Sequence, residues 1–124
     1  ALAIFYGMQG KDKDFIRKQV LDEYYPNWSA LTYEGIKPGY GFDETCQQTI
    51  PAALICFLES KDYEDCLKLA IALGGDADTL AAISGPMAYA FYKTMPEELI
   101  ANAKAKLPEW MLEVNEELDH YVNQ

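Results

Sequence analysis

Apolar residues recur along this chain at the spacing of amphipathic helices, and no stretch shows the alternation of a strand. We therefore predict an all-α fold. The predicted helices are residues 1–8, Asp12 or Asp14 to Tyr24, 43–58, Ser60 or Asp62 to Leu73, about 79–92, Thr94 or Pro96 onward, and Pro108 onward. The last of these carries an apolar side formed by Trp110, Met111, Val114 and Leu118.

Prolines and glycines refine these boundaries. Pro26 is expected to end the second helix, and residues 26–42, rich in Gly, Pro and aromatic residues, are predicted to form a long irregular loop. Pro51 lies inside the third predicted helix and is expected to kink it or to mark a later start. Gly74 is the predicted stop of the fourth helix. Pro86 is expected to bend the helix that follows it.

Composition and charge narrow the class of protein. A chain of 124 residues forms one domain at most, and 20 acidic against 10 basic residues argue against a nucleic-acid or anionic-membrane surface. The longest apolar run, Ile50 to Leu58, is too short to cross a bilayer, and no signal peptide is visible. Cys46, Cys56 and Cys66 are odd in number, and two lie in apolar helical patterns. We expect reduced cysteines in a cytoplasmic protein.

Candidate chemistry is concentrated after a double glycine, in the run Gly74-Gly75-Asp76-Ala77-Asp78-Thr79. Glycines tolerate the positive φ of a tight turn, which would bring the carboxylates of Asp76 and Asp78 together with the Thr79 hydroxyl. An all-oxygen ligand set selects Mg²⁺, Mn²⁺ or Ca²⁺ over zinc. The alternative is that Asp78 or Thr79 merely caps the following helix, and from the spacing alone this is the simpler interpretation.

The surroundings of this turn carry a family resemblance. The chain resembles the C-terminal part of the ADP-ribosylglycohydrolase family, in its bacterial branch, and the resemblance spans nearly all of its residues. The matching segments are Phe15-Ile16, Tyr24-Tyr25-Pro26, Glu44 to Leu54, Phe57-Leu58, Asp62 to Asp65, Ala70, the Gly74 to Gly85 run, Phe91-Tyr92 and Met95-Pro96. The Gly-Gly-Asp-Ala-Asp-Thr run is the most specific of them.

The resemblance implies an orthogonal helical bundle with a two-metal centre, usually Mg²⁺ or Mn²⁺. It also implies hydrolysis of the glycosidic bond between ADP-ribose and a protein or other acceptor, so that the partners are ADP-ribosylated proteins or ADP-ribose-containing small molecules. By the same resemblance, Asp76, Asp78 and Thr79 are metal ligands. The segment Gly39-Tyr40-Gly41-Phe42 matches a wall of the ADP-ribose pocket, where Tyr40 or Phe42 would stack on the substrate; an aromatic plug over the core is the alternative.

One departure from the family is important. Its complete members carry a Thr/Ser-Asp-Asp motif in their N-terminal half, and this chain has no such motif. We therefore expect residues 1–124 to be the C-terminal segment of a single family domain, inactive alone and weak in metal binding. No catalytic residue is identified in this segment, and the only histidine, His120, is interpreted as a solvated helix-end residue.

Two alternatives stay open at this stage: a non-catalytic binding or structural module derived from the same family, and a plain helical interaction module. If part of the fold is missing, apolar residues such as Leu2, Ile4 and Phe5 would be exposed, and the chain would self-associate through them.

Overall fold

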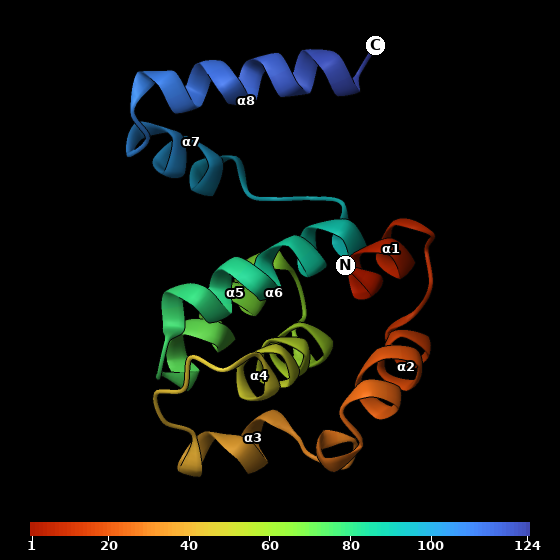
Figure 1. The fold of residues 1–124 in the computed structure, drawn as a ribbon. Coiled ribbons are helices and arrows are strands. Elements are labelled where there is room, and N and C mark those ends of the chain that lie inside the picture. The colour runs from red at the N-terminus through yellow and green to blue at the C-terminus, as the bar shows by residue number, and fades with distance from the viewer. The chain divides into compact units, whose positions relative to one another are not determined.

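Helices make up all the regular structure of this chain. A computed structural model describes residues 1–124 and contains no strand, which confirms the predicted all-α class (Figure 1). The chain divides into two units, Ala1–Thr94 and Met95–Gln124. The first contains α1 (Leu2–Met8), α2 (Lys13–Ile16), η1 (Arg17–Asp22), η2 (Pro26–Trp28), α3 (Tyr33–Ile36), η3 (Lys37–Gly39), α4 (Cys46–Glu59), α5 (Tyr63–Leu73) and α6 (Ala77–Tyr92); the second contains α7 (Glu97–Ala105) and α8 (Glu109–Val122).

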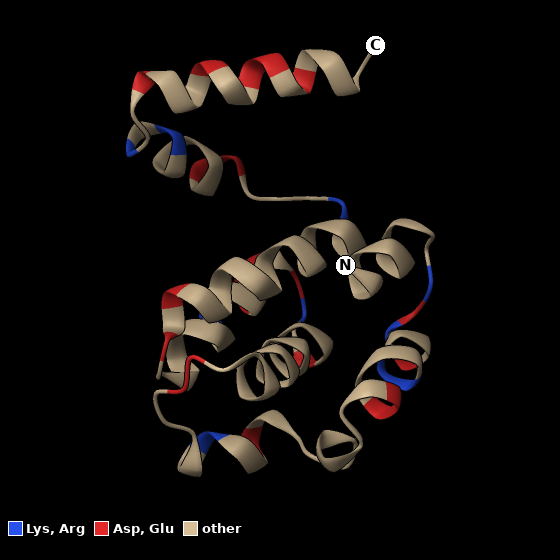
Figure 2. Cartoon of the chain, in the orientation of Figure 1, with Lys and Arg blue, Asp and Glu red and all other residues tan.

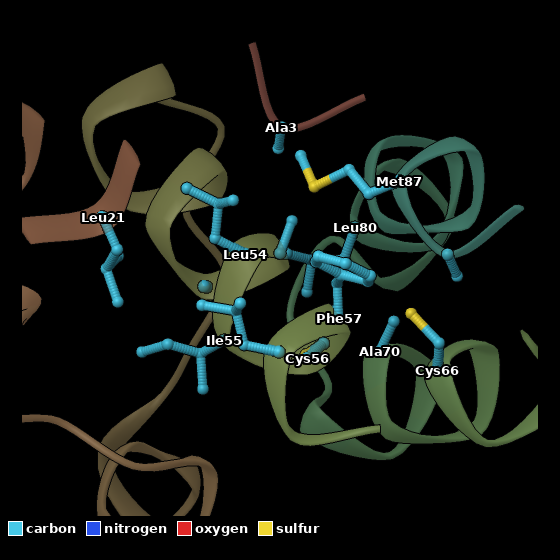
Figure 3. Close-up of a cluster of buried hydrophobic side chains, with 14 of the residues drawn as sticks. Ala3, Leu21, Leu54, Ile55, Cys56, Phe57, Cys66, Ala70, Leu80 and Met87 are labelled. Atoms are coloured by element: carbon cyan, nitrogen blue, oxygen red, sulfur yellow. The ribbon is translucent and has the colours of Figure 1, made fainter. Parts of the chain in front are cut away.

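Helix α4 is the centre of the first unit. Every residue from Pro51 to Leu58 is buried, so this stretch is covered on all sides. A helix that is apolar all round must be enclosed by its neighbours. Figure 3 shows Phe57 of α4 directed toward Leu80 of α6 and toward the side of α5 that carries Ala70 and Cys66, whereas Ile55 lies on the side of α4 away from α6. Helix α6 also packs against α1, and this core positions the turn between α5 and α6.

The start of α4 differs from the prediction. The helix begins at Cys46, three residues after the predicted Asp43. The Asp43 carboxylate accepts hydrogen bonds from the backbone N–H of Thr45, at 2.7 Å, and from its hydroxyl, at 2.6 Å. This local turn competes with the helix and delays its start, as Asp side chains commonly do. The helix then continues through Pro51, whose ring nitrogen donates no hydrogen bond.

The second predicted helix is only partly confirmed. Asp12 is its cap, since its carboxylate accepts from the N–H of Phe15 at 2.8 Å. After Ile16, however, the chain forms the wider π-helical turns of η1. Val20 and Leu21 are both buried there, and the apolar spacing of the sequence does not distinguish this winding from a regular helix.

Residues 26–42 are more ordered than the predicted irregular loop. They contain the short helices η2, α3 and η3, and the Thr32 hydroxyl caps α3 by accepting from the N–H of Gly35 at 3.1 Å. Tyr33 is buried, and its hydroxyl donates to the Leu69 carbonyl of α5 at 2.8 Å. This anchor holds the segment against the helices that carry the candidate site.

The later helices follow the prediction closely. Asp62 caps α5 by accepting from the N–H of Asp65 at 2.7 Å, α5 ends at Leu73, and α6 runs to Tyr92 through Pro86. In the second unit, α7 and α8 contain no buried residue. The predicted apolar side of α8 is exposed, with Trp110 at 61%. No helix of the chain combines the length and the apolar character needed to cross a membrane.

A lysine joins three elements of the first unit. The Lys13 ammonium donates to the Ser60 carbonyl at the end of α4, and to the Tyr92 hydroxyl of α6 at 2.6 Å. It also lies 5.0 to 5.7 Å from the ring centroids of Tyr92, Phe91 and Phe57. A cation near a helix C-terminus and beside aromatic faces is stabilised by both.

We predict that Lys13→Met lowers the free energy of unfolding by about 1–3 kcal/mol, the usual contribution of hydrogen bonds to a charged group. Lys18→Met, at an exposed position, is the matched control and should change it little. Urea denaturation followed by circular dichroism measures both variants. Equal stability of the two would show that the Lys13 contacts contribute nothing.

The three cysteines are unpaired, and they differ in reactivity. Cys46 is exposed, whereas Cys56 and Cys66 are buried. Burial raises the pKa of the Cys56 thiol to about 12 and also raises the pKa of Cys66, so both stay protonated and unreactive at neutral pH.

We predict that a thiol reagent at pH 8 labels Cys46 alone until the protein is denatured, and that Cys46→Ser abolishes labelling of the native protein. Rapid labelling of that variant would contradict the buried placement.

Candidate metal centre

Two glycines form the turn between α5 and α6. Gly74 has φ +86° and Gly75 has φ +64°, backbone conformations that other residues adopt only with strain. The N–H of Gly74 closes α5 by donating to the Ile71 carbonyl at 3.2 Å. Helix α6 then starts at Ala77, two residues before the predicted Thr79, so Asp76 occupies the N-cap position and Asp78 lies in the first turn.

The three predicted ligands lie together at this turn. A hydrogen bond with the Asp78 carboxylate raises the pKa of Asp76, while the Thr79 hydroxyl opposes this rise. The same bond lowers the pKa of Asp78, and the backbone N–H of Thr79, 2.9 Å from Oδ1 of Asp78, lowers it further. Two carboxylates this close repel each other when both are ionised, and a bound dication would relieve the repulsion. The residues present therefore fit a small cation that prefers oxygen ligands.

Neither Asp78 nor Thr79, the two caps that the sequence allowed, occupies the N-cap position of α6. Asp76 stands at the N-cap position, but its side chain makes no capping hydrogen bond. By contrast, Asp62 caps α5 and Asp12 caps α2 through their side chains. The Asp78 carboxylate also accepts a hydrogen bond from the N–H of the adjacent Thr79, and its charge suits the helix dipole. The Asp76 carboxylate is therefore not used to cap α6.

The predicted substrate loop lies against this turn. A Cβ placed on Gly75 would be 2.7 Å from the carbonyl oxygen of Gly41 and 3.0 Å from Cε1 of Tyr40. The structure thus brings together the two segments that the sequence singled out, Gly39–Phe42 and Asp76–Thr79. Tyr40 packs against the core, as the plug interpretation expects, whereas Phe42 is 72% exposed and free to meet a ligand.

Two further acids surround the site and were not singled out from the sequence. Glu44 lies close enough to contribute to the raised pKa of Asp76. Burial, followed by the charges of Asp43 and Asp76, raises the pKa of Tyr40. Figure 2 shows the acidic positions of the segment leading into α4 beside those at the start of α6. The sequence held one signal for Glu44, since this residue is the first of the Glu44 to Leu54 segment that resembles the family.

The ligand set of this chain is small. The structure has no group of three or more His, Cys, Asp or Glu residues arranged to hold a metal ion. The turn offers the carboxylates of Asp76 and Asp78 and the Thr79 hydroxyl, and a hard dication takes about six oxygens. The remaining ligands would have to be water, substrate or groups outside these three residues.

Another concave surface lies away from this turn. A groove of about 440 Å³ between α1 and α6 is lined by Ile4, Met8, Pro86, Tyr89, Ala90 and Lys93. Its only charged group, the Lys93 ammonium, already donates to the carbonyls of Met8 and Ala90. The groove holds no group for metal or acid–base chemistry.

The all-helical fold and the acidic turn after a double glycine agree with the family resemblance that the sequence suggested. The family model described as ADP-ribosylglycohydrolase matches residues 1–124, the whole chain. The chain therefore belongs to the ADP-ribosylglycohydrolase family, and the predicted membership is confirmed. No curated protein and no solved structure matched the chain.

Whether the Asp76 side chain caps α6 can be tested on the metal-free protein. We predict that Asp76→Ala changes the free energy of unfolding of the metal-free chain little, because no capping bond is lost. Asp62→Ala, which removes a side-chain cap, should cost about 1 kcal/mol. Urea denaturation in the presence of a chelator measures both. A loss for Asp76→Ala as large as that for Asp62→Ala would show that Asp76, rather than the predicted Asp78 or Thr79, caps α6.

Proposed function

We propose that this chain provides one arm of a two-metal centre that hydrolyses the glycosidic bond between ADP-ribose and a protein or other acceptor. The observation that supports the proposal is the convergence of Asp76, Asp78 and Thr79 beside the Gly39–Phe42 loop in a member of this family. Mg²⁺ or Mn²⁺ suits this all-oxygen ligand set.

In this proposal the residues of the chain have distinct roles. Asp76, Asp78 and Thr79 would hold the metal, and Glu44 adds negative charge beside them. A metal held there would supply Lewis-acid chemistry toward the ribose hydroxyls and a water. The surrounding carboxylates favour the positive charge that develops on the ribose as the bond to the acceptor breaks. Phe42, which is exposed, would offer an aromatic face on which the substrate could stack.

The small ligand set limits what the chain does alone. With three side-chain ligands, we expect weak metal binding and no turnover, because positioning of both metals requires more oxygen ligands. The three unpaired cysteines support a cytoplasmic location. Of the residues predicted to be exposed, Phe5 is 53% exposed, whereas Leu2 and Ile4 are partly buried against the core. Self-association of the chain stays a prediction.

Metal binding distinguishes this proposal from the non-catalytic alternative. We predict that calorimetric titration of the chain with Mn²⁺ shows weak binding, with Kd of about 10⁻³ M as in sites with few charged ligands. Asp76→Asn and Asp78→Asn should abolish it, because each removes a carboxylate ligand. Asp62→Asn is the matched control, since Asp62 serves as a helix cap.

An ADP-ribose release assay on an ADP-ribosylated peptide completes the test, and we expect no release by the isolated chain. Binding heats unchanged in the Asp76→Asn and Asp78→Asn variants would favour a helical module without a metal site. Efficient release of ADP-ribose would show that the chain contains a complete centre.

A further inference from the structure

The contact between Gly75 and the Gly39–Phe42 loop is closer than any side chain permits. The atom nearest to a Cβ on Gly75 is the backbone oxygen of Gly41, at 2.7 Å, followed by Cε1 of Tyr40 at 3.0 Å. Cβ atoms essentially never approach other atoms closer than 3.0 Å, and a backbone oxygen cannot rotate away as a flexible side chain can. A residue other than glycine at position 75 would therefore displace the loop, the turn or both.

This requirement is specific to Gly75. Gly74 also has a positive φ, but a Cβ there would meet no atom within 4 Å. Gly10, with φ +75°, likewise faces open space. Those two positions need glycine only for their backbone conformation. Gly75 needs it also because two segments of the chain cross there.

Tyr40 fixes the position of the loop at this crossing. Its ring is half-buried and packs against the core, while its hydroxyl is buried without a hydrogen-bond partner. The hydroxyl therefore contributes no bond that could hold the loop. The packing of the ring is what keeps the loop backbone against Gly75.

We propose that the contact of Tyr40 and Gly41 with Gly75 is a positioning device that sets the orientation of the Asp76 and Asp78 carboxylates toward the metal. Gly75 directly precedes Asp76, so a shift of the loop is transmitted to the first ligand through one peptide bond. Ligands must be held to within about 0.5 Å for productive geometry, and supporting residues commonly provide this. This inference rests on the proposed metal centre, and it makes metal affinity depend on where the loop lies.

The first test compares two glycines of similar conformation. Mn²⁺ affinity is measured by electron paramagnetic resonance for the wild-type chain, Gly75→Ala and Gly10→Ala, with thermal denaturation as a check that each folds. Both variants strain a positive-φ position, but only Gly75→Ala disturbs the loop contact. We expect Gly75→Ala to bind at least about tenfold more weakly, as for losses of supporting residues in metal sites, and Gly10→Ala to bind as the wild type does. Equal affinities would overturn the inference.

A second measurement does not need metal. In ¹⁵N–¹H correlation spectra, the backbone amides of Gly74 to Leu80 report the conformation of the turn. We expect Tyr40→Ala to shift these resonances and Tyr40→Phe to leave them in place, because the unpartnered hydroxyl contributes nothing to the contact. Unmoved turn resonances in Tyr40→Ala would overturn the inference.

The two measurements separate failure of this inference from failure of the proposed function. If the wild-type chain binds no Mn²⁺ at all, the proposed metal centre is wrong, and the amide shifts still decide whether the loop sets the turn. If Gly75→Ala does not fold, Tyr40→Ala takes its place in the Mn²⁺ titration, with Tyr40→Phe as its control.

Discussion

The burial of α4 on all sides is the constraint on which the first unit depends. Residues Pro51 to Leu58 have no polar face, so water must be excluded from them by neighbours in every direction. Helices α5 and α6 provide most of this cover, with α6 packed against both α4 and α5, and α3 and η1 also contact α4. The packing of α5 against α6 brings the end of α5 to the start of α6, and the short connection between them becomes the Gly74–Asp76 turn.

The candidate site results from this arrangement. A turn between two packed helices presents Asp76 and Asp78 at the surface of the core, where the carboxylates keep contact with water and with incoming ligands. The segment that leads into α4 passes the same point, which places Tyr40 and Glu44 beside them. Acidic charge is therefore gathered from two parts of the chain, and the repulsion among these groups is a cost that a bound cation would remove.

Individual residues show which parts of the structure could be predicted from the sequence. Gly74 was correctly predicted as a helix stop, and Asp62 was one of the two predicted caps, because both signals are local and depend on backbone chemistry alone. The predicted start at Asp43 was wrong because its carboxylate bonds to Thr45 instead of opening the helix. The π-helical turns of η1 were missed because apolar spacing alone does not reveal a local widening of the helix.

The sequence by itself determined the all-α class, most helix boundaries and the family, since these follow from apolar periodicity, caps and a specific motif. It also identified Asp76, Asp78 and Thr79 as a group, because neighbours in a turn are neighbours in space. Only the tertiary structure decided that the Gly39–Phe42 loop lies against Gly75 and that the charge of Glu44 acts on Asp76. These interactions join segments about 30 residues apart, and they exist because helix packing, rather than local propensity, brings the segments together.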